Sequence, residues 1–256
     1  MTKVMGYLCQ WGGYAASEMA AVGKRELPAG FRYINLRCTG RVDPVHLVQA
    51  LASGYQGVAV VGCERTICRY ETGNFYAASR VAWVQSLLVA LGFSPDRLTM
   101  GFANSEGRDV LKSFLEPYFQ QVESLGPLGS GSGFTKEEVA RRLTLAERVL
   151  QSRELRWCMG QEVVLARDMA DCFGRPFNVE DFRQRAQAVL LNVLGDSKVM
   201  ESLKDGSKAL AGVAADCADS ESAVLKRIVN LIAAGLVELE TTENRMPIFK
   251  SLDGSA

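Results

Sequence analysis

The sequence has one histidine, no net charge and no long apolar run. Lysine and arginine together number 29, as do aspartate and glutamate, so net charge gives no attraction to nucleic acid or to an anionic membrane. No stretch reaches the roughly 18 consecutive apolar residues of a membrane span. The residues that follow Met1 contain no signal-peptide core. We therefore expect a cytoplasmic protein that neither binds nucleic acid nor inserts into a membrane.

The scarcity of histidine also limits the chemistry of the chain. His46 is the only one, which excludes most His-rich metal sites and argues against a Cys–His catalytic dyad. Seven cysteines are present. Their number is odd and the cytosol keeps thiols reduced, so structural disulfides are not expected. Any chemistry at a site of this chain is therefore expected to depend on sulfur.

Residues 1–125 alternate between short apolar runs and helical patterns. Asp43 followed by Pro44 predicts a helix start, and a longer helix is expected over about 74–91. The apolar runs are 3–9, 32–38, 57–63 and 98–103. Short apolar runs that alternate with helices are typical of parallel strands. The pattern predicts an α/β domain with a doubly wound parallel sheet of about four strands.

The pattern changes after a Gly- and Ser-rich stretch at 126–134, which has the composition of a linker. Thr135 and Glu138 have the spacing of a capping box that opens a helix. Further helices are expected at 155–171, 179–194 and 197–203. The sequence thus predicts a domain at 1–125, a linker at 126–134 and a mainly helical domain at 135–256.

The end of the chain has a recognisable order of elements. A short helix at 209–215 is followed by a helix at 223–234, for which Asp219 is the expected cap. Two strands at 236–240 and 248–252 follow, with a turn at 243–245 between them. Two helices followed by a hairpin predict a winged-helix-like C-terminus.

Four cysteines carry most of the functional information. Cys9, Cys38 and Cys63 each end one of the first three apolar runs, and Cys68 follows shortly after the third. Ligands of open parallel sheets bind at the carboxyl ends of the strands, so these thiols are expected to converge there as the ligands of a metal centre. The remaining cysteines lie among apolar residues of predicted helices and are expected in the core; they are Cys158, Cys172 and Cys217.

Ligand type and spacing bear on the identity of the metal. Structural zinc sites usually draw their cysteines in close pairs, whereas only Cys63 and Cys68 are neighbours here. A widely spaced set of thiolates fits an iron–sulfur cluster better, of either the two-iron or the four-iron type, with zinc as the alternative. Residues beside the cysteines would give close backbone approach and positive charge; they are Gly12, Gly13, Gly40, Gly62, Arg37, Arg41, Arg65 and Arg69.

Motifs around these cysteines resemble the delta subunit family of methyl-viologen-reducing hydrogenase, also called hydrogenase iron–sulfur subunits. The resemblance covers about residues 1–128. It is carried by CQWGGYAAS at 9–17, CTGRVDP at 38–44, GCERTICRYETGN at 62–74, ANSEG at 103–107 and LGPL at 125–128. It implies a flavodoxin-like fold and a [2Fe-2S] cluster that passes electrons between a donor enzyme and a heterodisulfide-reductase-A-like flavoprotein. Related subunits serve hydrogenase, formate dehydrogenase and benzoyl-CoA reductase complexes of anaerobic metabolism, often around electron bifurcation.

The sequence departs from the family in one loop. The family commonly reads Gly-Cys-His-x-Gly-x-Cys-His-Tyr, and this chain has Glu64 and Arg69 at the histidine positions and Thr66 at the glycine. The thiols are kept, so cluster binding is still expected. The loop at 12–14 lacks the Ser/Thr-rich sequence that would cradle a flavin phosphate, so FAD is expected only in a partner subunit.

We interpret the chain as a non-catalytic electron-transfer subunit of a hetero-oligomeric oxidoreductase complex, with residues 135–256 docking onto partners. The alternative is a zinc or iron–sulfur thiolate sensor with a winged-helix regulatory domain. In the predicted helix at 223–234 only Lys226 and Arg227 are basic. A DNA recognition helix needs several polar or basic side chains on its outer face, so this composition favours docking onto protein.

Overall fold

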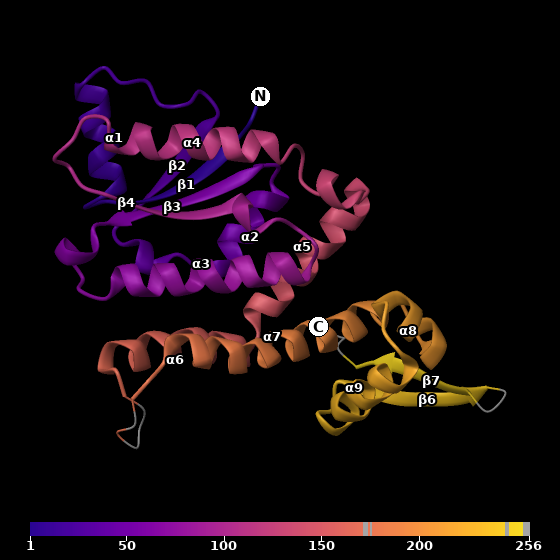
Figure 1. The fold of residues 1–256 in the computed structure, drawn as a ribbon. Coiled ribbons are helices and arrows are strands. Elements are labelled where there is room, and N and C mark those ends of the chain that lie inside the picture. The colour runs from indigo at the N-terminus through magenta and orange to yellow at the C-terminus, as the bar shows by residue number, and fades with distance from the viewer. Residues whose placement is uncertain (171–173, 175, 244–245, 253–256) are drawn as a thin grey trace. The chain divides into compact units, whose positions relative to one another are not determined.

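The computed structural model of the protein describes residues 1–170, 174, 176–243 and 246–252. The chain forms two compact units, Met1–Gln184 and Arg185–Ala256 (Figure 1). None of the helices within the described ranges is both long and apolar enough to cross a membrane.

The first unit is built on a four-stranded parallel sheet with the order β2-β1-β3-β4. The strands are β1 (Val4–Cys9), β2 (Phe31–Leu36), β3 (Gly57–Cys63) and β4 (Leu98–Ala103). The chain adds β2 on one side of β1 and β3 on the other, so the strand order reverses between β1 and β3. Ligands of open α/β sheets bind at such a switch point, outside the carboxyl ends of the strands. The predicted parallel sheet of four strands is confirmed.

Helices cover both faces of this sheet (Figure 1). Helices α1 (Gly13–Val22) and α4 (Val110–Ser124) lie on one face, and α2 (Pro44–Ala52) and α3 (Gly73–Ala90) lie on the other. Helix α2 begins where the sequence predicts, because Asp43 accepts a hydrogen bond from the Val45 N–H at 3.0 Å. Short 3-10 turns lie in the connections of this unit. Turn η1 (Thr39–Arg41) follows β2, η2 (Arg65–Ile67) follows β3, η3 (Pro95–Arg97) follows α3, and η4 (Ser130–Ser132) follows α4.

Burial separates the central strands from the edge. Strand β3 is buried along its whole length, whereas β2 is an edge strand on which Tyr33 and Ile34 are exposed. Strand β2 also ends at Leu36, so the predicted strand at 32–38 is too long and Cys38 lies in the turn beyond it. An apolar run in the sequence looks the same for an edge strand as for a central strand. The sequence therefore did not reveal that β2, at the edge, is shorter than predicted.

The Gly- and Ser-rich stretch at 126–134 packs on the first unit. Arg97 donates hydrogen bonds to the three carbonyls of 125–127 at 2.9–3.0 Å. Phe134 packs edge-on against Phe93, with ring centroids 5.7 Å apart. The two compact units divide downstream of this stretch. The domain boundary predicted at 126–134 stays a prediction.

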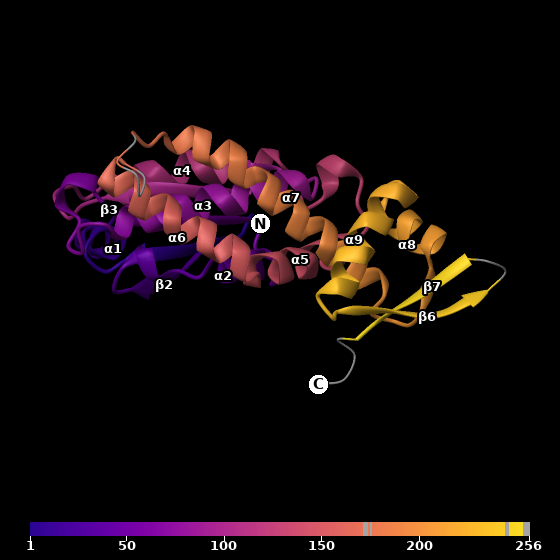
Figure 2. The same cartoon turned by 90° about the horizontal axis from the view of Figure 1, so that it is seen from below.

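Two further helices belong to the first unit. Helix α5 (Lys136–Gln151) packs on α2, and α6 (Arg153–Asp168) packs on α3 (Figure 2). The capping box predicted at Thr135 and Glu138 is confirmed, because both reciprocal hydrogen bonds are present.

The second unit packs α8 (Leu210–Cys217) and α9 (Glu221–Ala233) with a small antiparallel sheet of order β5-β7-β6. Its strands are β5 (Lys208–Ala209), β6 (Val237–Glu243) and β7 (Met246–Ser251). Ser220 caps α9 in place of the predicted Asp219, and β5 was not predicted. Part of the turn predicted at 243–245 lies outside the described residues. The finer names, flavodoxin-like for the first sheet and winged-helix-like for this unit, stay predictions.

Helix α7 (Val179–Ser202) corrects the prediction of two helices at 179–194 and 197–203. Gly195 lies inside the helix. A Cβ at this position would overlap the guanidinium of Arg227 on α9, which donates to Asp196 at 3.1 Å. The glycine therefore gives room for a side chain of α9 and does not end the helix.

Candidate metal centre

The four cysteines predicted as ligands lie at the carboxyl edge of the parallel sheet. Cys9 and Cys63 are the last residues of the adjacent strands β1 and β3. Cys38 begins η1 just after β2, and Cys68 ends η2. Cys9, Cys38 and Cys63 are buried and Cys68 is partly exposed. The topology thus places all four around the switch point of the sheet.

Glycines allow the loops that carry these cysteines to approach one another. A Cβ on Gly73, the first residue of α3, would overlap the Cys38 sulfur and would lie 3.7 Å from the Cys68 sulfur. A Cβ on Gly12 would lie only 2.5 Å from the Cα of Cys63. Neither position tolerates a side chain unless neighbouring atoms move. Two of the sulfurs therefore contact one point, and the loop after β1 lies against the end of β3.

The thiols also act on one another electrostatically. Burial, the charge on Cys9 and the contact with Cys68 raise the pKa of Cys63 to about 12, although the Arg69 N–H donates to its sulfur. Burial raises the pKa of Cys38 as well. The Gly40 N–H, which donates to the Cys38 sulfur at 3.4 Å, lowers this pKa but does not outweigh burial. Thiols that raise one another's pKa ionise together only when a cation compensates their charge.

The thiols are close but keep protein partners. Within the described residues, no three side chains of Cys, His, Asp or Glu are arranged around one metal position. The Cys9 thiol donates to the Arg37 carbonyl at 3.9 Å, and the Cys63 thiol donates to Asn74 Oδ1 at 3.8 Å. Metal ligation would require both thiols to leave these acceptors.

Asn74 fixes the end of β3 and was not among the predicted site residues. Its side chain is buried, and its Nδ2 donates to the carbonyls of Cys63 at 2.6 Å and Glu64 at 3.2 Å. Gly62 stands beside it, where a Cβ would lie 2.6 Å from Asn74 Oδ1. A polar residue in the first turn of a largely apolar helix, next to Gly73, is the signal that would have found it.

Thr39 is the second residue that sequence reasoning missed. Its side chain is fully buried, and its Oγ1 has no hydrogen-bond partner within the described part of the chain. Such a hydroxyl is costly unless something accepts its hydrogen bond. It directly follows Cys38, and a Cβ on Gly62 would lie 3.3 Å from it. A sulfur-rich anion at the thiol site would supply the missing acceptor.

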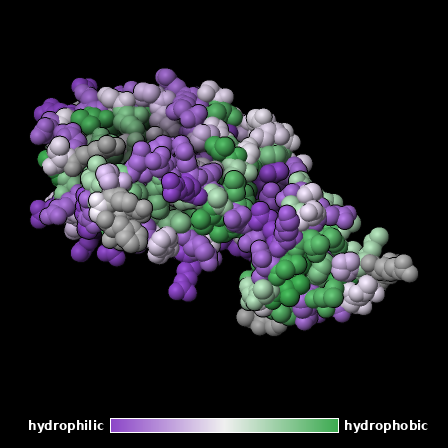
Figure 3. Space-filling view, turned by 60° about the horizontal axis from the view of Figure 1, so that its bottom comes forward, coloured by the Kyte–Doolittle hydropathy of each residue, from purple (hydrophilic) through white to green (hydrophobic). Residues whose placement is uncertain are grey.

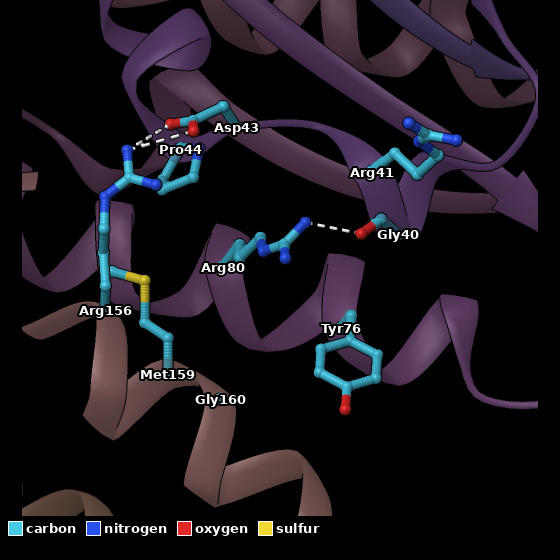
Figure 4. Close-up of a pocket in the computed structure, with 9 residues that line it drawn as sticks. All are labelled: Gly40, Arg41, Asp43, Pro44, Tyr76, Arg80, Arg156, Met159 and Gly160. Carbon is cyan, nitrogen blue, oxygen red and sulfur yellow. Dashed lines mark hydrogen bonds and ion pairs between the residues drawn. The ribbon is translucent and has the colours of Figure 1, made fainter. Parts of the chain in front are cut away.

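Arg80 of α3 holds the turn that carries Cys38. Its Nη1 donates to the Gly40 carbonyl at 2.5 Å (Figure 4) and to the Val42 carbonyl at 2.9 Å. Arg41, in the same turn, lowers the pKa of Cys38 by its charge, although burial outweighs this effect. The guanidinium of Arg80 therefore fixes η1, and its neighbour Arg41 supplies positive charge to the thiol site.

The residues at the two histidine positions of the family motif hold loops together. Glu64 accepts a hydrogen bond from Asn104 Nδ2 at 2.7 Å, which links the ends of β3 and β4. The guanidinium of Arg69 lies 4.4 Å from the ring centroid of Trp11, which links the loops after β1 and β3. The side chain of Arg65 lies outside the described part of the structure.

The other cysteines lie on elements that carry none of the four predicted ligands, or outside the described residues. Cys158 on α6 and Cys217 on α8 are both buried, as expected for core residues. Cys172, for which the same was expected, lies outside the described residues.

Comparison with known proteins assigns residues 4–126 to the family model of methyl-viologen-reducing hydrogenase, delta subunit. The iron-sulfur subunit of the vhu F420-non-reducing hydrogenase of Methanocaldococcus jannaschii is 35% identical over 124 residues, which are 48% of this chain and 92% of that protein. Its counterpart in Methanopyrus kandleri is 34% identical over 125 residues, 49% of this chain and 95% of that protein.

A larger relative contains a similar stretch. This protein, which belongs to the ferredoxin:CoB-CoM heterodisulfide reductase of Methanosarcina mazei, is 31% identical over 128 residues, which are 50% of this chain and only 16% of that protein. The stretch that the family model matches corresponds to the α/β part that carries the four cysteines. The chain belongs to the methyl-viologen-reducing hydrogenase delta subunit family.

Proposed function

We propose that this chain is an electron-transfer subunit that binds one [2Fe-2S] cluster through Cys9, Cys38, Cys63 and Cys68. When bound, the cluster supplies one-electron redox chemistry. The chain then relays single electrons between a partner oxidoreductase and a heterodisulfide-reductase-A-like flavoprotein. It performs no bond chemistry itself.

The observation that carries the proposal is the glycine packing around the thiols. Cys38 and Cys68 contact the same point beside Gly73, and Cys9 and Cys68 both act to raise the pKa of Cys38 and of Cys63. A core cysteine needs neither feature, since it behaves as a small apolar side chain. Four thiols at one edge of the sheet form an all-sulfur donor set, which is the kind of ligand set that an iron–sulfur cluster takes.

The surrounding residues fit an anionic, sulfur-rich group. The N–H groups of Gly40 and Arg69 already donate to thiol sulfurs, and the buried Thr39 hydroxyl has an unused donor. Hydrogen bonds to cluster sulfurs and nearby positive charge tune the reduction potential. Arg69 also lies over the ring of Trp11, which follows Cys9 by two positions in the sequence.

The two-iron type and the partners rest on the family. The two hydrogenase relatives are named iron-sulfur subunits of F420-non-reducing hydrogenases, and a stretch like this one occurs within a heterodisulfide reductase protein. These names support a place in a multi-subunit complex. We further propose that FAD is bound only in a partner subunit of that complex. The four-iron cluster and zinc are the alternatives for the same thiols.

The second unit is proposed to dock the chain onto its partners. Helix α9 buries Val224, Ile228 and Leu231 and exposes Leu225, Val229 and Ile232, and hydrophobic side chains gather on the exposed face of this unit (Figure 3). The rival, a sensor that binds DNA, requires basic side chains there. Arg227 is engaged with Asp196, which counts against that rival.

Anaerobic purification followed by iron, sulfide and zinc analysis tests the proposal. We expect two iron and two sulfide per chain. Replacement of Cys9, Cys38, Cys63 or Cys68 by alanine, one at a time, should abolish or strongly reduce both. Cys158→Ala and Cys217→Ala are the matched controls, because both cysteines are buried on helices that carry none of the proposed ligands, and they should keep the iron.

Each other outcome has a definite meaning. Four iron per chain would replace the two-iron proposal by the four-iron alternative. Stoichiometric zinc in a colourless protein would contradict the electron-transfer function. Equal loss of iron in the control variants would mean that the effect is one of folding, and the ligand assignment would fail.

A further inference from the structure

A pocket of about 400 Å³ lies directly beside the turn that carries Cys38 (Figure 4). Its walls come from Gly40 and Arg41 of η1, the start of α2, the first half of α3, and α6. Helix α6 lies outside the stretch matched to the family. The pocket is therefore built partly from family sequence and partly from the additional helices of this chain.

The charges that line the pocket do not balance. Three arginines, Arg41, Arg80 and Arg156, line the pocket together with one carboxylate residue, Asp43. Arg156 already occupies both oxygens of Asp43, at 2.9 and 3.0 Å. Arg80 is bonded to backbone carbonyls. The charge of an ionised Cys38 would also act on Arg80. Even with this second negative charge, the three arginines outnumber the negative groups.

This imbalance is costly at Arg80 in particular. Burial lowers the pKa of Arg80, an effect that the charge of Asp43 only partly offsets. A half-buried cation without a full counter-charge is stabilised by any anion that enters beside it. Guanidinium groups bind carboxylate and phosphate oxygens especially well, because their planar donors match those groups.

The remaining walls indicate that the anion has a carbon body. The ring of Tyr76 lies 5.9 Å from the Arg80 guanidinium, and its hydroxyl can donate to an oxygen. Met159 gives an apolar wall beside Gly160, which leaves open space. The volume lies within the usual range for small-molecule sites. We propose that this pocket binds a small organic anion, its carboxylate or phosphate group against Arg80 and Arg41 and its body against Tyr76 and Met159.

Binding there would act on the thiol site, a consequence that rests on the proposed function. Gly40 and Arg41 belong to the turn that begins at Cys38, so a bound anion adds negative charge next to a proposed cluster ligand. Negative charge disfavours reduction, so the anion should lower the reduction potential. By linkage, reduction should weaken anion binding by the same factor.

Calorimetric titration of the purified full-length chain at low ionic strength tests the site without reference to iron content. The probes are phenylacetate and phenyl phosphate, with neutral phenylacetamide as the matched control. We expect saturable binding of at least one anion and at least tenfold weaker binding of phenylacetamide. The anion that binds more tightly identifies the head group as carboxylate or phosphate.

Variants locate the binding. Arg80→Gln and Arg41→Gln should each weaken the anion at least fivefold, whereas Arg25→Gln, which removes an exposed arginine paired with Asp109, should not change it. If Arg80→Gln fails to fold, Arg41→Gln alone decides, because Arg41 is exposed. Equal binding of the neutral probe, no saturable binding of either anion, or no effect of Arg41→Gln would overturn the proposal. Anion binding to a chain that lacks iron would support the pocket while contradicting the proposed cluster.

Discussion

Gly73 and Cys38 are in such close contact that a Cβ on the glycine would overlap the cysteine sulfur. Gly73 is the first residue of α3, so this contact sets the distance between a core helix and the turn that carries a proposed cluster ligand. The same point contacts Cys68. The first residue of α3 therefore lies directly against two of the proposed ligand sulfurs.

Gly73→Ala should impair cluster binding. The new methyl group forces the Cys38 turn and the Cys68 loop apart, and such overpacking costs roughly 1–3 kcal/mol of folding free energy. We expect iron and sulfide per chain to fall to well under half of the wild-type value. Gly212→Ala in α8 is the control, since a Cβ there meets open space and alanine favours helix by up to about 1 kcal/mol. Unchanged iron content in Gly73→Ala would contradict the proposed ligand geometry.

Thr39→Val should lower the reduction potential of the bound cluster. Valine keeps the shape of the side chain but removes a buried hydroxyl that has no hydrogen-bond partner within the described residues. If that hydroxyl donates to a cluster or thiolate sulfur, its loss disfavours the more negative, reduced state by on the order of 50 mV. A redox titration followed by visible absorption measures the shift. Thr39→Ser should retain the wild-type potential, and an equal shift in both variants would assign the effect to packing.

The ion pair between Asp43 and Arg156 should make stability depend on pH. Burial acts to raise the pKa of Asp43, but the Val45 N–H, Arg156 and the nearby His46 outweigh it and hold that pKa below its ordinary value. A carboxyl whose pKa is lower in the folded than in the unfolded chain stabilises the fold at any pH above its unfolded pKa. This stabilisation is lost as the pH falls through the lower, folded-state pKa.

Asp43→Asn tests that pH dependence. Asparagine keeps the cap of α2 but cannot ionise. We expect the wild type to have a higher free energy of unfolding in urea than this variant at pH 7, and this difference should shrink as the pH falls to 3. Asp205→Asn, at an exposed carboxylate, should run parallel to the wild type. If the difference in free energy of unfolding between the wild type and Asp43→Asn stays constant across this pH range, the ion pair contributes nothing to the pH dependence of stability.

Glu162 should be one of the most sensitive positions for folding. It is 3% exposed and accepts from Ser79 at 3.1 Å, Trp83 at 2.7 Å and Arg183 at 2.6 Å. Glu162→Ala leaves these donors without their acceptor and should cost roughly 3–5 kcal/mol. Thermal unfolding measures the loss, and Glu154→Ala, on the exposed face of the same helix, should change stability by less than about 0.5 kcal/mol.

The α/β architecture could be predicted because its signals are local. Asp43 with Pro44 marks the start of α2, and the run that ends at Cys63 is apolar throughout because β3 is covered on both faces. The length of β2 and the continuity of α7 could not be predicted. They depend on the position of a strand at the sheet edge and on Arg227, which is far from Gly195 in the sequence.

The candidate site was predictable in its thiols but not in its supports. Cysteines at strand ends are visible in the sequence, because parallel strands bring their carboxyl ends together. Asn74 and Arg80 act through partners fixed only by the fold, Asn74 on the end of β3 and Arg80 on the turn after β2, and only the fold buries the Thr39 hydroxyl. The residue types of Thr39 and Arg80 are ordinary for a turn or a helix, so no sequence pattern distinguished them, whereas the position of Asn74 next to Gly73 was a usable signal.

Electron paramagnetic resonance of the anaerobically purified, dithionite-reduced chain tests the central claim most directly. A single [2Fe-2S] cluster held by Cys9, Cys38, Cys63 and Cys68 predicts a spin-one-half signal close to one spin per chain. That signal should be absent before reduction and in Cys38→Ala, and present in Cys158→Ala. A chain that gives no signal after reduction and contains one zinc would contradict the account.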